Sequence, residues 1–570
     1  MMLGEGFMEN VSSNSRAEYE RWLASETICD DIRKELVGIG KDEGLITDRF
    51  WKNLSFGTGG IRGRIGAGTN RINTVVVRRV TQGLADYIKS KGGDSACIAY
   101  DTRNFSRVFA ETCAEVLCAN GLKAYLFSDV RPTPMLSFAV IEKKASAGIV
   151  ITASHNPSEY NGYKVYGADG GQVTDKAANE ISDNIRKHDI LAKFPQIKME
   201  EARKKGLLFD LDDVDARYYE QVKSLVVRND VISKNASDLN VLFTPLHGAG
   251  NIPVRRVLCD LGFNVEVVKE QELPDGDFPT VLKPNPEDAD AFKLALNEAK
   301  SKQYDIIIAT DPDADRIGVQ TLDDSGEYKA LNGNEIGILL SDYLVTAKKQ
   351  GGKLAKNTAI VKTIVTTELV RKICDDNGVA CIETLTGFKY IGEKITEWEK
   401  TGEYEFLLGF EESYGYLAGT FVRDKDAIIA AALVCEMALY YKLKKLSLHQ
   451  ALENLFSKYG YSGEKLLTVI TEGVDGMEKI NGIMKTFREQ PESLFNKDSI
   501  ASFQDYKDGF DGLPKSNVVK IIFADNSWLA VRPSGTEPQI KFYFGARGDN
   551  SEQVKARLIE FETSMREKFA

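Results

Sequence analysis

The chain has 570 residues, 43% hydrophobic and 28% charged, so it is globular and too long for a single hydrophobic core. Its formal net charge is −11 and no long lysine or arginine run occurs, which argues against nucleic acid or an anionic membrane as a partner. No stretch is apolar for long enough to span a bilayer, and residues 1–14 contain no apolar core of a signal peptide. The eight cysteines form no CxxC pair, which indicates buried free thiols and a cytoplasmic location.

Strands and amphipathic helices alternate through most of the chain, which predicts parallel βαβ units. A helical pattern over 16–45 and a glycine-rich segment at 56–63 come first. The first unit is then predicted from helices at 75–89, 106–120 and 133–143 and from strands at 96–101, 123–127 and the run into Ser154.

The same alternation returns twice. The second unit is predicted from strands at 239–244, 264–268 and 304–310 and helices at 252–261 and 289–300. The third is predicted from helices at 335–347, 368–376 and 427–442 and strands at 359–364, 380–383 and 406–408. Beyond residue 446 the pattern changes to helices at 447–458, 477–488 and 552–568 and short strands at 518–523, 528–531 and 540–544.

We therefore predict an α/β protein with three related α/β domains and a C-terminal α+β domain. The predicted domains cover residues 1–215, 216–335, 336–455 and 456–570.

A buried strand is predicted to deliver one hydroxyl, Ser154, to the edge of the first sheet. The apolar run 149–151 leads into the segment 152–157, Thr-Ala-Ser-His-Asn-Pro, which we call the serine loop. Ligands of open α/β sheets bind beyond the carboxyl ends of the strands, which favours a nucleophile or a metal ligand. A serine that only caps a turn is the alternative. A serine hydroxyl also needs a base, a metal or a preloaded phosphoryl group to react.

Three carboxylates follow the next predicted strand end, in the segment 311–316, which we call the aspartate loop. Asp311, Asp313 and Asp315 alternate along it, so they can converge on one hard divalent cation such as Mg²⁺. An EF-hand is excluded, because its glycine and glutamate positions are occupied by Arg316 and Leu322. An acidic surface turn is the alternative interpretation.

Two further segments carry polar groups. Residues 532–538, Arg-Pro-Ser-Gly-Thr-Glu-Pro, contain the guanidinium, hydroxyls and glycine turn of an anion-binding loop, although an ordinary tight turn has the same composition. Glu411 and Ser413 end an apolar strand and can accept hydrogen bonds from adjacent sugar hydroxyls, but alone they favour a solvated turn. Lys164 and Lys389 are candidate phosphate contacts or proton carriers, although most lysines are solvated.

Four of these segments occur in the order found in one family: 152–157, 311–316, 409–415 and 532–538. The chain resembles the α-D-phosphohexomutase superfamily of phosphoglucomutases and phosphomannomutases, and is most similar to the bacterial glucose-type and phosphopentomutase-like branch. It departs from the usual Gly-Glu-Glu-Ser-Phe-Gly motif at Phe410 and Tyr414. The resemblance implies four domains around a central cleft.

The resemblance also implies the roles of individual residues. Ser154 is expected to be a phosphoserine, and Mg²⁺ to be bound by its phosphate and by the three aspartates. Catalytic roles are expected for His155, Lys389, Arg62 and Lys164. Substrate contacts are expected for Arg316, Glu411, Ser413, Arg532, Ser534, Gly535 and Thr536.

The expected activity is therefore an isomerase that interconverts glucose 1-phosphate and glucose 6-phosphate, with glucose 1,6-bisphosphate as an activator. Phosphomannomutase or phosphopentomutase activity is the alternative within the family. A sugar-phosphate-binding protein without turnover and a phosphohydrolase are alternatives of other classes. The expected partners are small sugar phosphates, and the expected state is a monomer or a weak homo-oligomer.

Overall fold

The computed structural model describes residues 2–57, 59–471, 476–495, 499–534 and 539–569. The chain divides into two compact units, which are described one at a time. Unit 1 comprises residues 1–226, 232–319 and 419–435, and unit 2 comprises residues 227–231, 320–418 and 436–570. Three elements contain a boundary between the units: α10 (Asn229–Asn235), β10 (Ile317–Leu322) and α16 (Ala427–Leu443).

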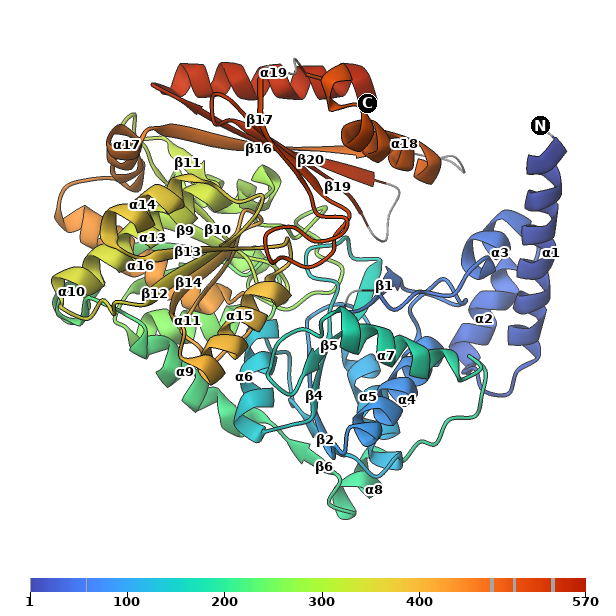
Figure 1. Ribbon diagram of the computed structural model, residues 1–570. Coiled ribbons are helices and arrows are strands. Elements are labelled where there is room, and N and C mark those ends of the chain that lie inside the picture. The colour runs from blue at the N-terminus through green and yellow to red at the C-terminus, as the bar shows by residue number, and fades with distance from the viewer. Residues whose placement is uncertain (1, 58, 472–475, 496–498, 535–538, 570) are drawn as a thin grey trace. The chain divides into compact units, whose positions relative to one another are not determined.

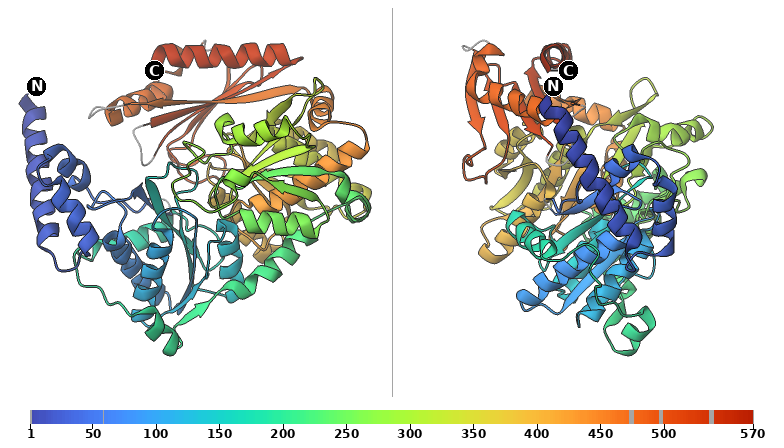
Figure 2. Two further views of the ribbon diagram at one scale, coloured as in Figure 1. Left: turned by 180° about the vertical axis from the view of Figure 1, so that it is seen from behind. Right: turned by 90° about the vertical axis from the view of Figure 1, so that its right-hand side faces the viewer.

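Unit 1 begins with three helices that lie beside one another (Figures 1 and 2). They are α1 (Met2–Ala24), α2 (Asp30–Ile39) and α3 (Glu43–Phe50). The predicted helical pattern over 16–45 is thus divided between them, and a new helix starts where the Asp42 side chain accepts a hydrogen bond from the Leu45 N–H. The rings of Trp22 and Phe50 meet edge to face in the core of the three helices.

The first sheet of unit 1 has the strand order β1-β5-β4-β2-β3-β6. Its central strands β2 and β4 are completely buried and parallel, as the continuous apolar runs predict, whereas β5 is antiparallel to β4. Its strands are β1 (Gly60–Arg64), β2 (Ser95–Tyr100), β3 (Lys123–Leu126), β4 (Ala147–Ile151), β5 (Tyr160–Gly167) and β6 (Leu208–Asp210). Its helices are α4 (Thr74–Ser90), α5 (Ser106–Ala119), α6 (Thr133–Lys143), α7 (Asp175–Arg186) and α8 (Met199–Lys204).

In the second sheet of unit 1, β7 (Asn240–Thr244) pairs in parallel with β8 (Asn264–Val267) and with β9 (Ile306–Thr310), and β10 lies next to β9. Its helices are α9 (Asp215–Ser224), α11 (Asn251–Asp260) and α12 (Lys293–Ala299). The prediction of an α-helix over 289–300 is wrong for its first residues, because Ala289–Phe292 form a 3-10 turn and α12 begins only at Lys293. Other 3-10 turns are Asp212–Val214, Ala236–Asp238 and Lys269–Gln271.

Unit 2 contains a third sheet with the order β13-β12-β14-β15, in which β12 pairs in parallel with β13 and β14. Its strands are β12 (Thr358–Thr363), β13 (Ala380–Thr384), β14 (Glu405–Glu411) and β15 (Gly415–Ala418). Strand β11 (Tyr328–Leu331) is not part of this sheet and pairs with β10. Its helices are α13 (Gly333–Gln350), α14 (Leu369–Asn377), α15 (Phe388–Thr401) and α17 (Leu448–Tyr459). The side chains of Asn332 and Glu335 form a capping box at the start of α13.

The C-terminal part of unit 2 is an antiparallel sheet with the order β16-β20-β19-β18-β17. Its elements are β16 (Tyr461–Ile470), α18 (Gly476–Glu489), a 3-10 turn (Pro491–Ser493), β17 (Ile500–Asp505), β18 (Val519–Phe523), β19 (Trp528–Pro533), β20 (Gln539–Gly548) and α19 (Ser551–Phe569). Helix α19 runs along one face of this sheet (Figures 1 and 2). The predicted α+β character is confirmed, although β16 and β17 were missing from the prediction.

The four sheets confirm the predicted architecture of three α/β parts and a C-terminal α+β part. Within the described ranges, no helix is both long and apolar enough to cross a membrane. All eight cysteines are free, but the prediction that they are buried is wrong for Cys29 and Cys259, which are exposed.

Candidate functional site in unit 1

The serine loop follows β4, and its shape is fixed by local hydrogen bonds. Ser154 has a φ of 52°, in the left-handed region, and its N–H donates to Thr152 Oγ1 at 2.8 Å. The side chain is 3% exposed. The Ser154 hydroxyl donates to Asp311 Oδ2 at 2.7 Å, and its Oγ lies 3.3 Å from His155 Nδ1. The predicted meeting of the serine loop and the aspartate loop is therefore found in the structure.

The guanidinium group of Arg103 forms hydrogen bonds with the backbone of the serine loop and of the residues that follow it. It donates to the carbonyl oxygens of Ser154, Asn156, Pro157 and Tyr160, with distances of 2.8 Å to Pro157 and 3.1 Å to Tyr160. Asp101 lies 3.4 Å from the Arg103 Nε, and both side chains are fully buried. A planar fork that binds four carbonyl oxygens fixes the loop backbone, so Arg103 positions Ser154 without touching its hydroxyl.

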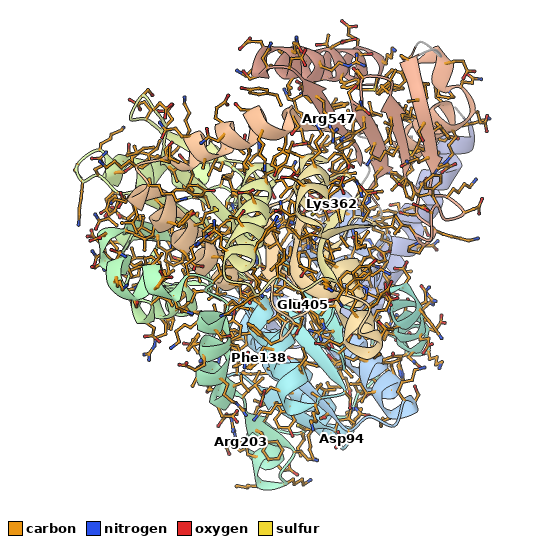
Figure 3. The ribbon with its side chains drawn as sticks, turned by 60° about the vertical axis from the view of Figure 1, so that its left-hand side comes forward. Asp94, Phe138, Arg203, Lys362, Glu405 and Arg547 are labelled. Atoms are coloured by element: carbon orange, nitrogen blue, oxygen red, sulfur yellow. The ribbon has the colours of Figure 1, made fainter. Side chains whose placement is uncertain are left out.

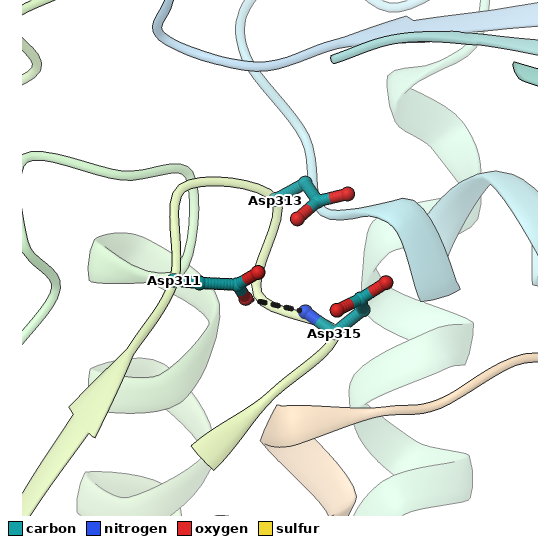
Figure 4. Close-up of side chains that lie close together, drawn as sticks. All are labelled: Asp311, Asp313 and Asp315. Atoms are coloured by element: carbon teal, nitrogen blue, oxygen red, sulfur yellow. Dashed lines mark hydrogen bonds between the residues drawn. The ribbon is translucent and has the colours of Figure 1, made fainter. Parts of the chain in front are cut away.

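The aspartate loop places three buried carboxylates between β9 and β10 (Figure 4). One ligand oxygen from each of Asp311, Asp313 and Asp315 lies within 4.8 Å of the others. The Asp311 Oδ1 accepts hydrogen bonds from the N–H groups of Asp315 and Arg316, both at 3.1 Å. These backbone bonds turn the loop so that all three side chains point to one place.

The donor set of this cluster suits a divalent cation. Asp313 Oδ1 and Asp315 Oδ1 are buried and accept no hydrogen bond. A buried carboxylate oxygen without a partner is costly, and a hard cation satisfies several such oxygens at once. Asp311, Asp313 and Asp315 thus form a candidate metal site, and the Ser154 hydroxyl lies beside it.

Two lysines balance part of the negative charge. Lys164, on β5, lies with its Nζ 2.8 Å from Asp313 Oδ2 and 3.6 Å from Asp315 Oδ2. Lys425, which follows β15, lies with its Nζ 3.2 Å from Asp315 Oδ2 and 3.0 Å from Asp424 Oδ1. The Tyr166 hydroxyl donates to Asp424 Oδ2 at 2.6 Å and so fixes that carboxylate behind the lysine.

Burial and charge shift the protonation of the cluster in opposite directions. Burial, together with the charges of Asp313 and Asp315, raises the pKa of Asp311 well above its usual value. Burial also acts to raise the pKa of Asp313, but the Lys164 ammonium outweighs it and holds that pKa below the usual value. Asp313 therefore stays a carboxylate in its ion pair with Lys164.

The remaining predicted residues of unit 1 lie around the serine loop. Arg62, on β1, donates to Asn156 Oδ1 at 3.0 Å. Burial and the charges of Arg316 and Arg62 lower the pKa of His155 well below its usual value, so its imidazole is neutral at pH 7. Arg316 forms an ion pair with Glu287, and its Nε lies 3.8 Å from Asp315 Oδ1.

Three predicted site residues, Glu411, Lys389 and Ser413, belong to unit 2. Glu411 is the last residue of β14 and is only 5% exposed, so the alternative of a solvated turn is wrong for this side chain. Its Oε1 accepts a hydrogen bond from the Gly387 N–H at 2.8 Å. Lys389 is in the first turn of α15, with its Nζ 4.8 Å from the centre of the Tyr390 ring. Ser413 lies in the turn between β14 and β15.

The predicted anion-binding loop is described only at its edges. Arg532 lies near the end of β19 opposite Lys541 of β20, and the Ser534 N–H donates to the Gln539 carbonyl at 2.8 Å. Gly535 and Thr536 lie outside the described residues. Their expected contacts remain predictions.

Two residues of the site, Arg103 and Lys425, were not predicted from the sequence. Neither residue lies in a segment with a recognisable composition, and each acts on a residue more than 50 positions away in the chain. An arginine directly after a buried strand, as Arg103 follows β2, is a weak signal for a site residue.

Four family models match the chain in succession. They are the phosphoglucomutase/phosphomannomutase alpha/beta/alpha domain I at residues 53–191, domain II at 216–324, domain III at 332–459 and the C-terminal domain at 468–560. Residues 1–52, which include α1, α2 and α3, lie outside these matches.

Relatives and solved structures agree with this match. The phosphoglucomutase of Staphylococcus haemolyticus is 36% identical over 526 residues, which cover 90% of this chain and 94% of that protein. The open form of a Paramecium phosphoglucomutase, parafusin, has a TM-score of 0.70 at 18% identity, covering 91% of this chain and 96% of that one. An Aspergillus fumigatus N-acetylphosphoglucosamine mutase, solved with GlcNAc-6P and magnesium, has a TM-score of 0.51 at 14% identity over 95% of this chain and 100% of that one. The chain belongs to the phosphoglucomutase/phosphomannomutase family.

Proposed function

We propose that the protein interconverts glucose 1-phosphate and glucose 6-phosphate through a phosphoserine at Ser154 and a bisphosphate intermediate. The observation that carries this proposal is the 2.7 Å hydrogen bond between the Ser154 hydroxyl and Asp311 in a cluster of three buried carboxylates. The similarity to proteins named phosphoglucomutase over most of the chain supports the choice of glucose.

In the first step, a sugar hydroxyl oxygen forms a bond to the phosphorus of the phosphoserine, and the bond between that phosphorus and the Ser154 Oγ breaks. The resulting sugar bisphosphate reorients. The Ser154 Oγ then attacks the other phosphoryl group, so the phosphoenzyme is regenerated and the isomeric monophosphate leaves. Positioning and charge neutralisation are the main catalytic factors in such a transfer.

Several side chains of unit 1 serve these steps. Arg103 fixes the backbone of the serine loop, and the neutral His155 imidazole lies beside the Ser154 Oγ. Lys425 and Lys164 form ion pairs with carboxylates of the aspartate loop. Their positive charges therefore lie close to the site of phosphoryl transfer. We propose that Lys389 accepts the proton of the sugar hydroxyl, the catalytic role that the resemblance implies for it, and that the released Ser154 Oγ takes up a proton in the same step. Lys425, an ammonium held by Asp315 and Asp424, supplies positive charge near the transferring phosphoryl group.

We further propose that Asp311, Asp313, Asp315 and the seryl phosphate bind Mg²⁺. When bound, the ion neutralises negative charge on the phosphoryl oxygens. The two carboxylate oxygens without hydrogen bonds support this ligand set. We propose that Arg62, Arg316, Glu411, Ser413, Arg532, Ser534, Gly535 and Thr536 bind the substrate, and that glucose 1,6-bisphosphate restores enzyme that has lost its phosphate.

The deciding experiment compares wild type with Ser154→Ala. We expect an intact mass one phosphate above the sequence mass, which phosphatase treatment or the substitution removes, and no conversion of glucose 1-phosphate by the variant. Turnover retained by Ser154→Ala would exclude the phosphoserine mechanism. Release of free phosphate as the main product would instead favour a phosphohydrolase.

The choice of sugar is tested with glucose, mannose and ribose 1-phosphates at equal concentration. The highest kcat/KM is expected with glucose 1-phosphate. A preference for mannose or ribose 1-phosphate would assign the enzyme as a phosphomannomutase or a phosphopentomutase.

A further inference from the structure

A cluster of buried charges lies in unit 2, apart from every residue used above. Lys362, on β12, is completely buried, and Figure 3 labels it within the side-chain packing of this unit. Its Nζ lies 2.6 Å from Glu383 Oε1 and 3.1 Å from Glu368 Oε1. Arg371 Nη2 lies 3.2 Å from Glu383 Oε1, and Lys520 Nζ lies 3.3 Å from Glu368 Oε1.

The charges of this cluster do not balance. Three cations, Lys362, Arg371 and Lys520, share two carboxylates in these ion pairs. A third carboxyl group, that of Glu464, interacts electrostatically with Lys362 and Glu368, but burial raises its pKa to about 7, so below that pH it is protonated and one positive charge is in excess. Lys520 is only 3% exposed, and burial together with the charge of Lys362 lowers its pKa. Uncompensated buried charge is costly, and a bound anion removes that cost.

A cavity of about 220 Å³ opens onto this cluster. Its walls belong to unit 2 and include the side chains of Glu368, Arg371, Glu383, Lys520, Trp528 and Arg547. Arg547, labelled in Figure 3, adds a fourth cation, and no carboxylate of the described residues forms an ion pair with it. Burial lowers the pKa of Lys372, and the positive charge of Arg547 lowers it further.

We propose that this cavity binds a small oxyanion of phosphate type, held by Arg371, Lys520 and Arg547. Guanidinium groups present paired N–H donors that match the oxygens of phosphate, and Asn526 adds an amide donor to the lining. The volume equals that of roughly seven water molecules, so a phosphate group enters with a small organic substituent or with water. The Trp528 ring forms one wall, with Lys520 Nζ 4.9 Å from its centre.

The cavity is separate from the predicted phosphate contacts at Arg532 and Ser534. Trp528 pairs with Gly545 at one end of β19 and β20, whereas Pro533 pairs with Ile540 at the other. Pro533 lies five positions after Trp528 along β19, a distance of about 17 Å at roughly 3.3 Å per residue. The inference does not rest on the proposed mutase activity.

A bound oxyanion would also join two parts of unit 2. Arg371 belongs to α14 of the third sheet, whereas Lys520 and Arg547 belong to the C-terminal sheet. An anion that contacts all three residues stabilises the packing of these parts on each other, so we expect it to raise the thermal unfolding temperature.

The test uses calorimetric titration of the full chain in a chloride-poor, phosphate-free buffer. Every protein carries Arg532→Met, so that phosphate does not bind at the predicted substrate loop. To this background we add either Arg547→Met or the control Arg256→Met, which removes an exposed arginine paired with Asp260 elsewhere. The probes are inorganic phosphate, glycerol 3-phosphate and succinate.

We expect saturable phosphate binding in the background protein and the Arg256→Met control, and binding at least ten-fold weaker with Arg547→Met. Stronger binding of glycerol 3-phosphate than of inorganic phosphate would identify an organic phosphate as the ligand, and the reverse would identify the free ion. Equal phosphate affinity with Arg547→Met and Arg256→Met would overturn the proposal, as would a preference for succinate. Turnover of Arg547→Met in the otherwise native chain is expected to stay at the wild-type level, which separates this site from the mutase mechanism.

Discussion

The Nζ of Lys425 lies 3.2 Å from Asp315 Oδ2, although 110 positions separate the two residues in the chain. Asp424 holds the other side of the ammonium group at 3.0 Å, and Tyr166 fixes Asp424. An ammonium group held between two carboxylates beside the aspartate loop is well placed to stabilise negative charge on a transferring phosphoryl group.

The first prediction concerns this lysine. Lys425→Met is expected to lower kcat by about 10²- to 10³-fold, the usual effect of removing one group that stabilises charge in the transition state. The rate at which glucose 1,6-bisphosphate phosphorylates Ser154 is the second measurement, and we expect it to fall as well, because this transfer is a step of the same cycle. Lys34→Met, which removes an exposed lysine of α2, serves as control. A variant with wild-type kcat would show that Lys425 does not act on the transferring phosphoryl group.

The second prediction concerns Arg103. Arg103→Lys keeps the positive charge but loses the fork that binds four carbonyl oxygens, so the serine loop is no longer fixed. We expect a loss of about 3 kcal/mol in the free energy of unfolding, as for other broken buried charge networks. Urea unfolding measures this loss. We also expect a fall in kcat larger than the change in KM.

Arg107→Lys is a matched control for Arg103→Lys, because Arg107 is an exposed neighbour that pairs with Glu111. If Arg103→Lys retained both the stability and the kcat of the wild type, the positioning role of Arg103 would be wrong.

The third prediction concerns the candidate metal site. Mg²⁺ at about 100 times its dissociation constant is expected to stabilise the wild-type protein by about 2.7 kcal/mol, because only the folded chain holds the three carboxylates together. Asp313→Asn removes one ligand charge and is expected to abolish this effect. Unfolding midpoints with Mg²⁺ and with a chelator provide the measurement. Mg²⁺ stabilisation of equal size in the variant would place the ion elsewhere.

The fourth prediction concerns Asp426, which caps α16. Its Oδ1 accepts hydrogen bonds from the N–H groups of Ile428 and Ile429 at 2.9 Å, and Tyr218 donates to its Oδ2 at 2.7 Å. Burial raises the pKa of Asp426 to about 7. Because the folded pKa exceeds the unfolded one, the folded state binds the proton more tightly, and this stabilisation is lost as the pH rises toward 7.

We therefore expect wild-type stability relative to Asp426→Asn to fall between about pH 4 and pH 7, by up to about 4 kcal/mol, and then to level off. Asparagine keeps the oxygen that caps the helix but does not titrate. Urea unfolding at several pH values measures the difference between the two proteins, which removes the contributions of other titrating groups. Parallel pH profiles would show that Asp426 does not titrate in this range.

The parts of the fold and of the site that could be predicted from the sequence are those determined by the residues of a single short segment. The continuous apolar runs before Ser154 and Asp311 predicted buried strands, and the turn residues after them predicted polar loops at the sheet edge. The contact between Ser154 and Asp311 was implied by the resemblance to the phosphohexomutase superfamily, because the general position of ligands in α/β sheets placed each loop at a sheet edge but did not bring the two loops together.

The remaining parts depend on contacts that no short segment encodes. Arg103 and Lys425 resemble surface residues in sequence. Only the folded chain buries Arg103 beside the serine loop and brings the half-buried Lys425 to the aspartate loop. Strand β16 escaped prediction because its residues are largely exposed or half-buried and lack a clear apolar alternation. Glu411 was expected to be exposed to solvent, because a carboxylate at the end of a strand is normally exposed. In the structure it is buried, and its carboxylate accepts a hydrogen bond from the Gly387 N–H.

The left-handed backbone of Ser154 restricts which amino acid can occupy this position. Threonine carries the same hydroxyl, but its branched β-carbon is poorly tolerated at a φ of 52°. A threonine would have to distort the turn or point its hydroxyl away from Asp311. The chain thus has little freedom to exchange one alcohol for the other here, although both are equally able to carry a phosphate.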